Sequence, residues 1–248
     1  SPDLYVYTDQ IGNEFTFFGF NTASNKADGQ IWKIADPDGN VAYVGDSSTA
    51  STAVTNGFDA GGRITKAYDS ADRRYTYTYN SDSTPHLESV VAETKSGGTW
   101  ASPTGVTERA RVEYEYYGSE DYGDEGDLKL VKTTTPLSDS GVSSVKRKYY
   151  RYWEGSFDSS TNPGHVHALK LILDYEGARN FDWGEDGTES PEAIDEGYKT
   201  ASHSTLEPFA LAYFEYDSNH LIDETWSNGA CGCGGGATGT HYLEYETS

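Results

Sequence analysis

The sequence predicts an all-β protein, built as an open, curled antiparallel sheet of stacked β-hairpins. Three observations lead to this prediction. Aromatic residues make up 14% of the chain, apolar and polar residues alternate along several segments, and clusters rich in Asp and Gly separate those segments. Tyr, Thr and Val dominate the alternating segments, which is the composition of strands. Apolar residues at helical spacing are missing, and only residues 190–198 predict a short helical turn.

Alternation with a period of two predicts strands that each bury one face. These strands are expected at residues 5–7, 15–17, 75–79, 112–116 and 242–245. Turns are expected between them, at residues 36–40, 59–62 and 121–127. Asp favours a turn because its carboxylate bonds to the nearby backbone, and Gly favours it because it adopts a positive φ.

A repeated unit of strand, turn and aromatic strand runs through the chain. An apolar residue follows a turn about six times, at Ile31, Ile64, Leu87, Leu128, Leu169 and Leu221. Asp recurs five residues after this position at Asp36, Asp69 and Asp174, and Gly follows three residues later at Gly39 and Gly177. A two-stranded unit cannot bury its aromatic face alone, so neighbouring units are expected to stack into one core.

The motifs FDAGGRI at residues 58–64, YTYN at 77–80 and YFEYDSNHL at 213–221 resemble the RHS/YD-repeat family of extracellular bacterial proteins. Its pattern is Tyr-Asp-x-x-Gly-Arg-Leu, a turn, then Tyr-x-Tyr-Asp. The likeness covers about residues 20–246, with insertions near 97–110, 118–127 and 182–198. Phe58 and Asn80 depart from the pattern, and the units at Leu87 and Leu128 lack the Asp turn. The resemblance implies a curling sheet of stacked hairpins.

Charge and composition indicate which partners and which cellular location to expect. The chain carries 40 Asp and Glu against 18 Lys and Arg, a net charge of −22, which disfavours nucleic acid and anionic membranes as partners. Membrane insertion is not expected, since no apolar run approaches roughly 20 residues. The absence of Met and the start at Ser1-Pro2 indicate a piece processed from a longer precursor. High acidity, richness in Ser, Thr, Tyr and Gly, and only two cysteines together favour a location outside the cell or at the cell surface.

The sequence shows no nucleophile elbow, zinc-protease motif, phosphate loop or dinucleotide fingerprint, so it is not expected to be an enzyme.

The leading hypothesis is a structural protein, the subunit of a self-assembling surface fibre or filament formed as a head-to-tail homo-oligomer. Residues 1–20 form the N-terminal strand segment, which is exchanged between subunits in this hypothesis, and residues 21–248 form the repeat domain. The residues expected to carry assembly are Tyr5, Tyr7, Phe15 and Phe17.

The alternative function is a carbohydrate-binding or adhesion module that calcium assists. Its glycan-stacking candidates are Trp100, Trp153 and Trp183, each of which also suits packing in the core. A third option is a fragment of a toxin-delivery shell.

Both cysteines lie in one Gly-rich string, as Cys231 and Cys233. Three interpretations stay open at this point. The pair forms a disulfide, either with each other or as a crosslink to another chain. It binds zinc with His220 and His241, or it belongs to a plain loop.

Acidic clusters offer calcium ligands. Apart from this calcium alternative and the zinc interpretation of the cysteine pair, no cofactor is expected. The first cluster supplies Asp121, Asp124 and Asp127, and a second contains Asp182, Glu185, Asp186 and Glu189. A solvated acidic loop is the favoured explanation of either cluster, because runs of charge usually face water. His165 and His167 would place two imidazoles on one strand face as a weak metal pair, with no third ligand evident nearby.

Overall fold

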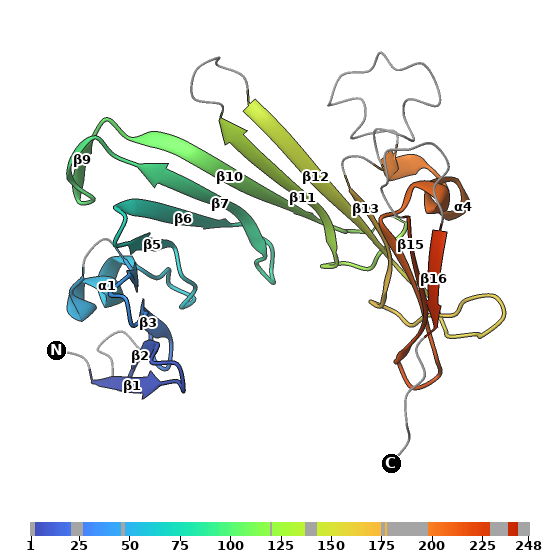
Figure 1. Ribbon diagram of the computed structural model, residues 1–248, viewed down its shortest axis with the longest axis horizontal. Coiled ribbons are helices and arrows are strands. Elements are labelled where there is room, and N and C mark those ends of the chain that lie inside the picture. Colours follow the sequence, from blue (N-terminus) through green and yellow to red (C-terminus); the bar gives the residue numbers. More distant parts are fainter. Residues whose placement is uncertain are drawn as a thin grey trace. The chain divides into compact units, whose positions relative to one another are not determined.

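The computed structural model describes residues 3–20, 27–45, 48–119, 121–136, 143–174, 177, 198–228 and 238–242. Within these residues, fourteen strands form one open antiparallel sheet, in the order β1-β2-β3-β4-β5-β6-β7-β10-β11-β12-β13-β14-β15-β16 (Figure 1). Strands that neighbour each other in the sheet are therefore also near in sequence. The all-β, open-sheet prediction is confirmed.

The element bounds are as follows. The strands of the first half are β1 (Leu4–Thr8), β2 (Glu14–Phe18), β3 (Ile31–Ala35), β4 (Val41–Val44), β5 (Lys66–Asp69), β6 (Arg73–Tyr79) and β7 (Leu87–Thr94). A separate two-stranded ribbon, β8 (Gly97–Thr99) and β9 (Ser102–Thr104), lies within the predicted insertion at 97–110. The later strands are β10 (Thr107–Tyr116), β11 (Leu128–Pro136), β12 (Ser143–Tyr152), β13 (Leu169–Asp174), β14 (Ala212–Tyr216), β15 (Ile222–Asn228) and β16 (Thr238–Tyr242). The helices are α1 (Ala50–Asn56), α4 (His203–Leu206) and the 3₁₀ turn η1 (Glu207–Phe209).

The repeated apolar residues mark where strands begin. Ile31, Leu87, Leu128 and Leu169 are the first residues of β3, β7, β11 and β13. The other two, Ile64 and Leu221, lie two residues and one residue before β5 and β15. The repeat therefore has a structural basis: it places one new strand after each turn.

The turn aspartates organise the hairpins through one recurring arrangement. At the β5–β6 turn, Asp69 Oδ1 accepts the N–H groups of Ala71 and Arg73 at 3.0 and 3.1 Å. Arg73 also donates its Nε to Asp69 Oδ2 at 2.8 Å. The same acceptance of the backbone two and four residues ahead recurs at the turns that begin with Asp9, Asp59 and Asp217.

The fourth residue of each turn adopts a left-handed conformation. Gly39 has a φ of 87° and Gly62 a φ of 80°, values that glycine tolerates without steric cost. Asp72 and His220 occupy the same position in their turns with φ of 61° and 66°. The turn therefore requires a positive φ at its fourth residue. Glycine meets this requirement most easily, and two turns meet it with another residue.

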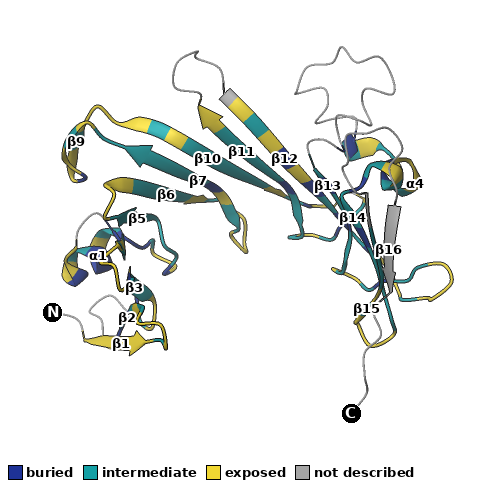
Figure 2. Ribbon diagram, viewed as in Figure 1, coloured by how far each residue is buried: buried dark blue, intermediate teal, exposed yellow. Residues whose placement is uncertain are grey.

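The chain divides into two compact units. The first comprises Ser1–Glu113 and Thr133–Ser144, and the second comprises Tyr114–Lys132 and Val145–Ser248. Each unit has its own apolar core, visible as the dark segments of Figure 2. The core of the first unit packs α1 against the sheet through Ala53 and Val54, with Phe18 and Phe58. The core of the second unit centres on Leu130, Leu171, Leu173, Tyr149 and Leu206.

Helix α1 was not predicted, because seven residues are too few to show a helical stripe. Its buried residues are Ala50, Ala53 and Val54, small side chains that let the helix lie close to the sheet. An isolated helix of this length is unstable in water, so packing against Phe58 and Trp32 stabilises it. The expected helical turn at 190–198 lies outside the described residues except for its last residue, Tyr198, which is helical.

The Asp69 carboxylate should stabilise the fold in a pH-dependent way. Burial opposes its ionisation, but the hydrogen bonds and charge of Arg73 outweigh burial and hold the pKa of Asp69 below its usual value. Replacing Asp69 by Ala should lower the free energy of unfolding by about 1–2 kcal/mol at pH 7. Since the folded-state pKa is depressed, this contribution is present above about pH 4 and is lost as pH falls through the folded-state pKa.

Urea denaturation of Asp69→Ala at pH 7 and pH 3 measures this difference. Asp38→Ala is the control, because Asp38 is an exposed turn residue and its removal should leave stability unchanged. Equal losses in the two variants at pH 7 would contradict the assigned role of the turn carboxylate.

Candidate functional site

Strand β1 is the first candidate site, an edge strand that is exposed along its whole length (Figure 2). Tyr5, Val6 and Tyr7 are each 60–61% exposed. Ile11 in the following turn and Phe20 after β2 are each 77% exposed. Large apolar side chains on both sides of this hairpin are therefore open to solvent, which marks interaction surfaces in soluble proteins.

The four predicted assembly residues share one face of the β1–β2 hairpin. Tyr5 lies opposite Phe17, and Tyr7 lies opposite Phe15 with ring centroids 6.1 Å apart. Residues that oppose each other on paired strands point to the same side of a sheet. The intervening residues of β2 point to the other side, where Phe18 is fully buried in the first unit's core. The structure thus brings all four together on the face opposite that core.

The backbone of β1 leaves one row of polar groups unpaired. Gly19 donates its N–H to the carbonyl of Asp3 at 2.8 Å, which makes this a hydrogen-bonded pair of the β1–β2 ladder. Bonded and non-bonded pairs alternate in an antiparallel ladder, so the odd-numbered residues of β1 bond to β2. The even-numbered residues direct their N–H and C=O groups to the free edge, with Val6 at its centre.

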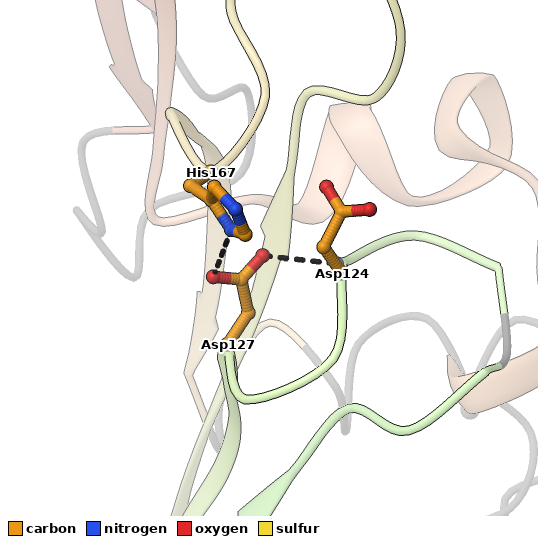
Figure 3. A group of neighbouring side chains, drawn as sticks. All are labelled: Asp124, Asp127 and His167. Carbon is orange, nitrogen blue, oxygen red and sulfur yellow. Dashed lines mark hydrogen bonds and ion pairs between the residues drawn. The ribbon is translucent and has the colours of Figure 1, made fainter.

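The second candidate site is a cluster of two carboxylates and one imidazole in the second unit (Figure 3). Asp124 and Asp127 precede β11, and His167 precedes β13. Their ligand atoms all lie within 4.8 Å of one another. His167 Nδ1 lies 2.9 Å from Asp127 Oδ1, and Asp127 Oδ2 accepts the N–H of Asp124 at 2.9 Å.

Two tight turns hold these side chains in place. Asp127 donates its N–H to the carbonyl of Asp124 at 3.0 Å, and Gly126 between them has a φ of 92°. His167 occupies the corresponding position of a second turn, which the Ala168 N–H closes on the carbonyl of His165, and its φ is 66°. The turn conformation directs the His167 ring to Asp127.

The cluster differs from the sequence predictions in two respects. Asp121 is exposed and is not part of it, so two of the three predicted calcium ligands come together, with His167 as the third member. The prediction that His165 and His167 share a strand face was wrong, because neither residue lies in a strand. His165 instead stacks between Phe157 and His220, with ring centroids 4.8 and 3.6 Å away.

A buried arginine anchors the chain around α4 to the sheet in the same unit. Arg151 of β12 is fully buried and donates Nη2 to the carbonyls of Tyr198 and Ala201 at 2.9 and 2.6 Å. Its guanidinium carbon lies 3.6 Å from the ring centroid of Tyr122, and His203 contacts the same ring edge-on. Burial, with the charges of Lys170 and Arg151, lowers the pKa of His203 to about 3.

The remaining predicted residues contribute no site within the described residues. Trp100 and Trp153 are 5% and 4% exposed, so neither offers an open ring face to a sugar. Cys231, Cys233 and Trp183 lie outside the described residues, as does the acidic cluster of 182–189. The sequence named His167 as a weak metal ligand, but its spacing could not show that His167 meets Asp127, which lies 40 residues away.

The hydrogen bond to Asp127 should shift the titration of His167. This bond, together with the charge of Asp127, raises the pKa of His167 above its ordinary value. We expect the imidazole of the metal-free protein to titrate above about 6.5 and the shift to diminish in Asp127→Asn. The pair stabilises the fold below the unfolded-state pKa, and this stability is lost as pH rises through the folded-state pKa.

NMR titration of the histidine ring protons in the presence of a chelator measures this shift. His203 is the internal control, because it should stay neutral from pH 5 to 8 in both proteins. An unshifted His167 in the parent protein, or the same pKa in Asp127→Asn, would show that the pair does not form.

Comparisons with known proteins do not assign the chain to a family. No family model matches it, and no curated protein sequence matches it. A solved porin-like protein from Bacteroides uniformis is similar at a TM-score of 0.38 and 10% identity, over 96% of this chain and 87% of that chain. A likeness at this TM-score supports no functional inference. In the part of the chain that the structure describes, no helix is long and apolar enough to cross a membrane.

Proposed function

We propose that this chain is a non-enzymatic extracellular structural protein whose copies assemble head to tail into a filament. One observation carries the proposal: β1 is an uncovered edge strand, and all five of its residues are exposed. An exposed edge with unpaired N–H and C=O groups pairs readily with a strand of another chain.

Strand β1 lacks the features that usually protect an edge. Its sequence, Leu-Tyr-Val-Tyr-Thr, contains no charged residue and no proline. Its pairing with β2 runs through five consecutive residue pairs without a bulge. Proteins normally block an edge with charges, prolines or bulges, so the properties of β1 support a role in pairing.

The partner strand in this proposal is β16 of the next copy, at the other edge of the sheet. The chain has a net charge of −22, and copies therefore repel one another on average. The sequences of β1 and β16 contain no Asp or Glu, so this repulsion is weakest where the two edges would meet. Two different edges that pair head to tail form an open filament when the rotation between copies does not close a ring.

The resemblance to RHS/YD repeats stays a prediction, and the turn structure supports it. The Tyr-Asp pairs at Tyr68-Asp69 and Tyr216-Asp217 both lie where a strand ends and a turn begins.

The adhesion alternative receives no comparable support, since two of its three tryptophans are buried. Extracellular location belongs to the proposal as well, and it rests on the acidic, Tyr-rich and Gly-rich composition.

Replacing Val6 by Pro should abolish filament formation and leave the fold intact. The N–H of Val6 points to the free edge, so proline removes an edge donor without breaking a bond to β2. Val6→Thr retains the N–H and the β-branched shape, and it should assemble like the parent protein. Negative-stain electron microscopy and sedimentation velocity at physiological salt measure assembly, and far-UV circular dichroism checks the fold.

A second variant, Val6→Lys, adds an edge charge of the kind that protects natural sheets and should also prevent assembly. A parent protein that stays monomeric at high concentration would contradict the proposal. Filaments of Val6→Pro and Val6→Lys equal to those of the parent would show that β1 is not the interface.

A further inference from the structure

We propose that Asp124, Asp127 and His167 form a Zn²⁺ site that ties two loops of the second unit together. The inference stands on the geometry of these loops and does not depend on the filament. Three donor groups of the kinds that zinc prefers converge from two chain segments (Figure 3). The loop before β11 supplies both carboxylates, and the loop before β13 supplies the imidazole.

A buried oxygen atom within the cluster independently points to a cation. Asp124 Oδ2 is shielded from solvent and has no hydrogen-bond partner among the described residues. A carboxylate oxygen that is removed from water without a donor is energetically costly, unless a cation compensates for it. Hydrogen bonds within the cluster do not meet this need, because the Asp127 carboxylate is itself an acceptor.

A metal ion could bind to this cluster while the backbone hydrogen bond that orients the Asp127 carboxylate stays in place. Asp127 Oδ2 accepts the backbone N–H of Asp124, and this bond fixes the carboxylate. The other oxygen, Oδ1, accepts a hydrogen bond from His167 Nδ1 at 2.9 Å. A metal ion would replace the proton of this bond, since a ligating imidazole must be deprotonated. The hydrogen bond from the Asp124 N–H to Oδ2 would then orient the Asp127 carboxylate while its Oδ1 binds the metal.

The donor set favours zinc over calcium. Calcium takes six to eight oxygen ligands in proteins, whereas this cluster offers two carboxylates and one nitrogen. Zinc binds both imidazole nitrogen and carboxylate oxygen, and a site with three protein ligands leaves a fourth position for water. His167 therefore changes the assignment from the calcium site expected at Asp121, Asp124 and Asp127 to a zinc site without Asp121.

Calorimetric titration with ZnCl₂ tests the site in chelator-treated protein. The Cys231→Ser/Cys233→Ser background removes the thiols as competing ligands. We expect one zinc ion to bind per chain, and His167→Ala to weaken binding at least about tenfold. The His167 side chain is 59% exposed, so its removal should not unfold the protein. Asp124→Asn should weaken binding as well.

Asp121→Asn is the matched control, because Asp121 lies on the same loop and outside the cluster. It should bind zinc like the parent, and zinc should perturb the NMR signals of His167 before those of His86 or His203. Equal affinity in His167→Ala and its parent would overturn the proposal, as would no binding at millimolar zinc. Calcium binding that depends on Asp121 and not on His167 would overturn it in favour of a calcium loop.

Discussion

The hydrogen bonds that an aspartate carboxylate accepts at the hairpin turns are the interaction on which this sheet depends. At Asp69 the carboxylate binds the backbone two and four residues ahead and also the Arg73 side chain. Such a turn fixes the pairing register of the strands that it joins. Because a one-residue slip would move every side chain to the other face, the turns also decide which residues are buried and which are exposed.

The β1–β2 hairpin shows this consequence most clearly. The Asp9 turn sets Tyr5 opposite Phe17 and Tyr7 opposite Phe15, and it thereby directs Phe18 into the core. The register also decides which backbone groups of β1 bond to β2 and which reach the free edge. The aromatic face and the open edge, on which the assembly proposal rests, both follow from the geometry of one turn.

The high acidic content has different roles along the chain. Asp59 and Asp69 act within turns and form ion pairs with the arginines four residues ahead. Asp124 and Asp127 converge with His167, where two loops meet. The sequence of β1 contains no acidic residue. Acidic side chains thus stabilise turns and offer carboxylate ligands for a cation. They are absent from the sequence of the edge strand that we propose to pair with another copy.

The sequence by itself determined many of the strands and turns, because both depend on local spacing. Alternation identified β1, β2, β6 and β10, the repeated apolar residues marked strand starts, and Asp-x-x-Gly marked the turn at Asp36. Tertiary structure alone decided what depends on distant contacts. Helix α1 is stabilised by packing against the sheet. Trp100 lies beneath the guanidinium of Arg74, and Trp153 packs edge-on against Tyr213. His167 joins Asp127 across 40 residues, since two turns without a shared sequence pattern place them together.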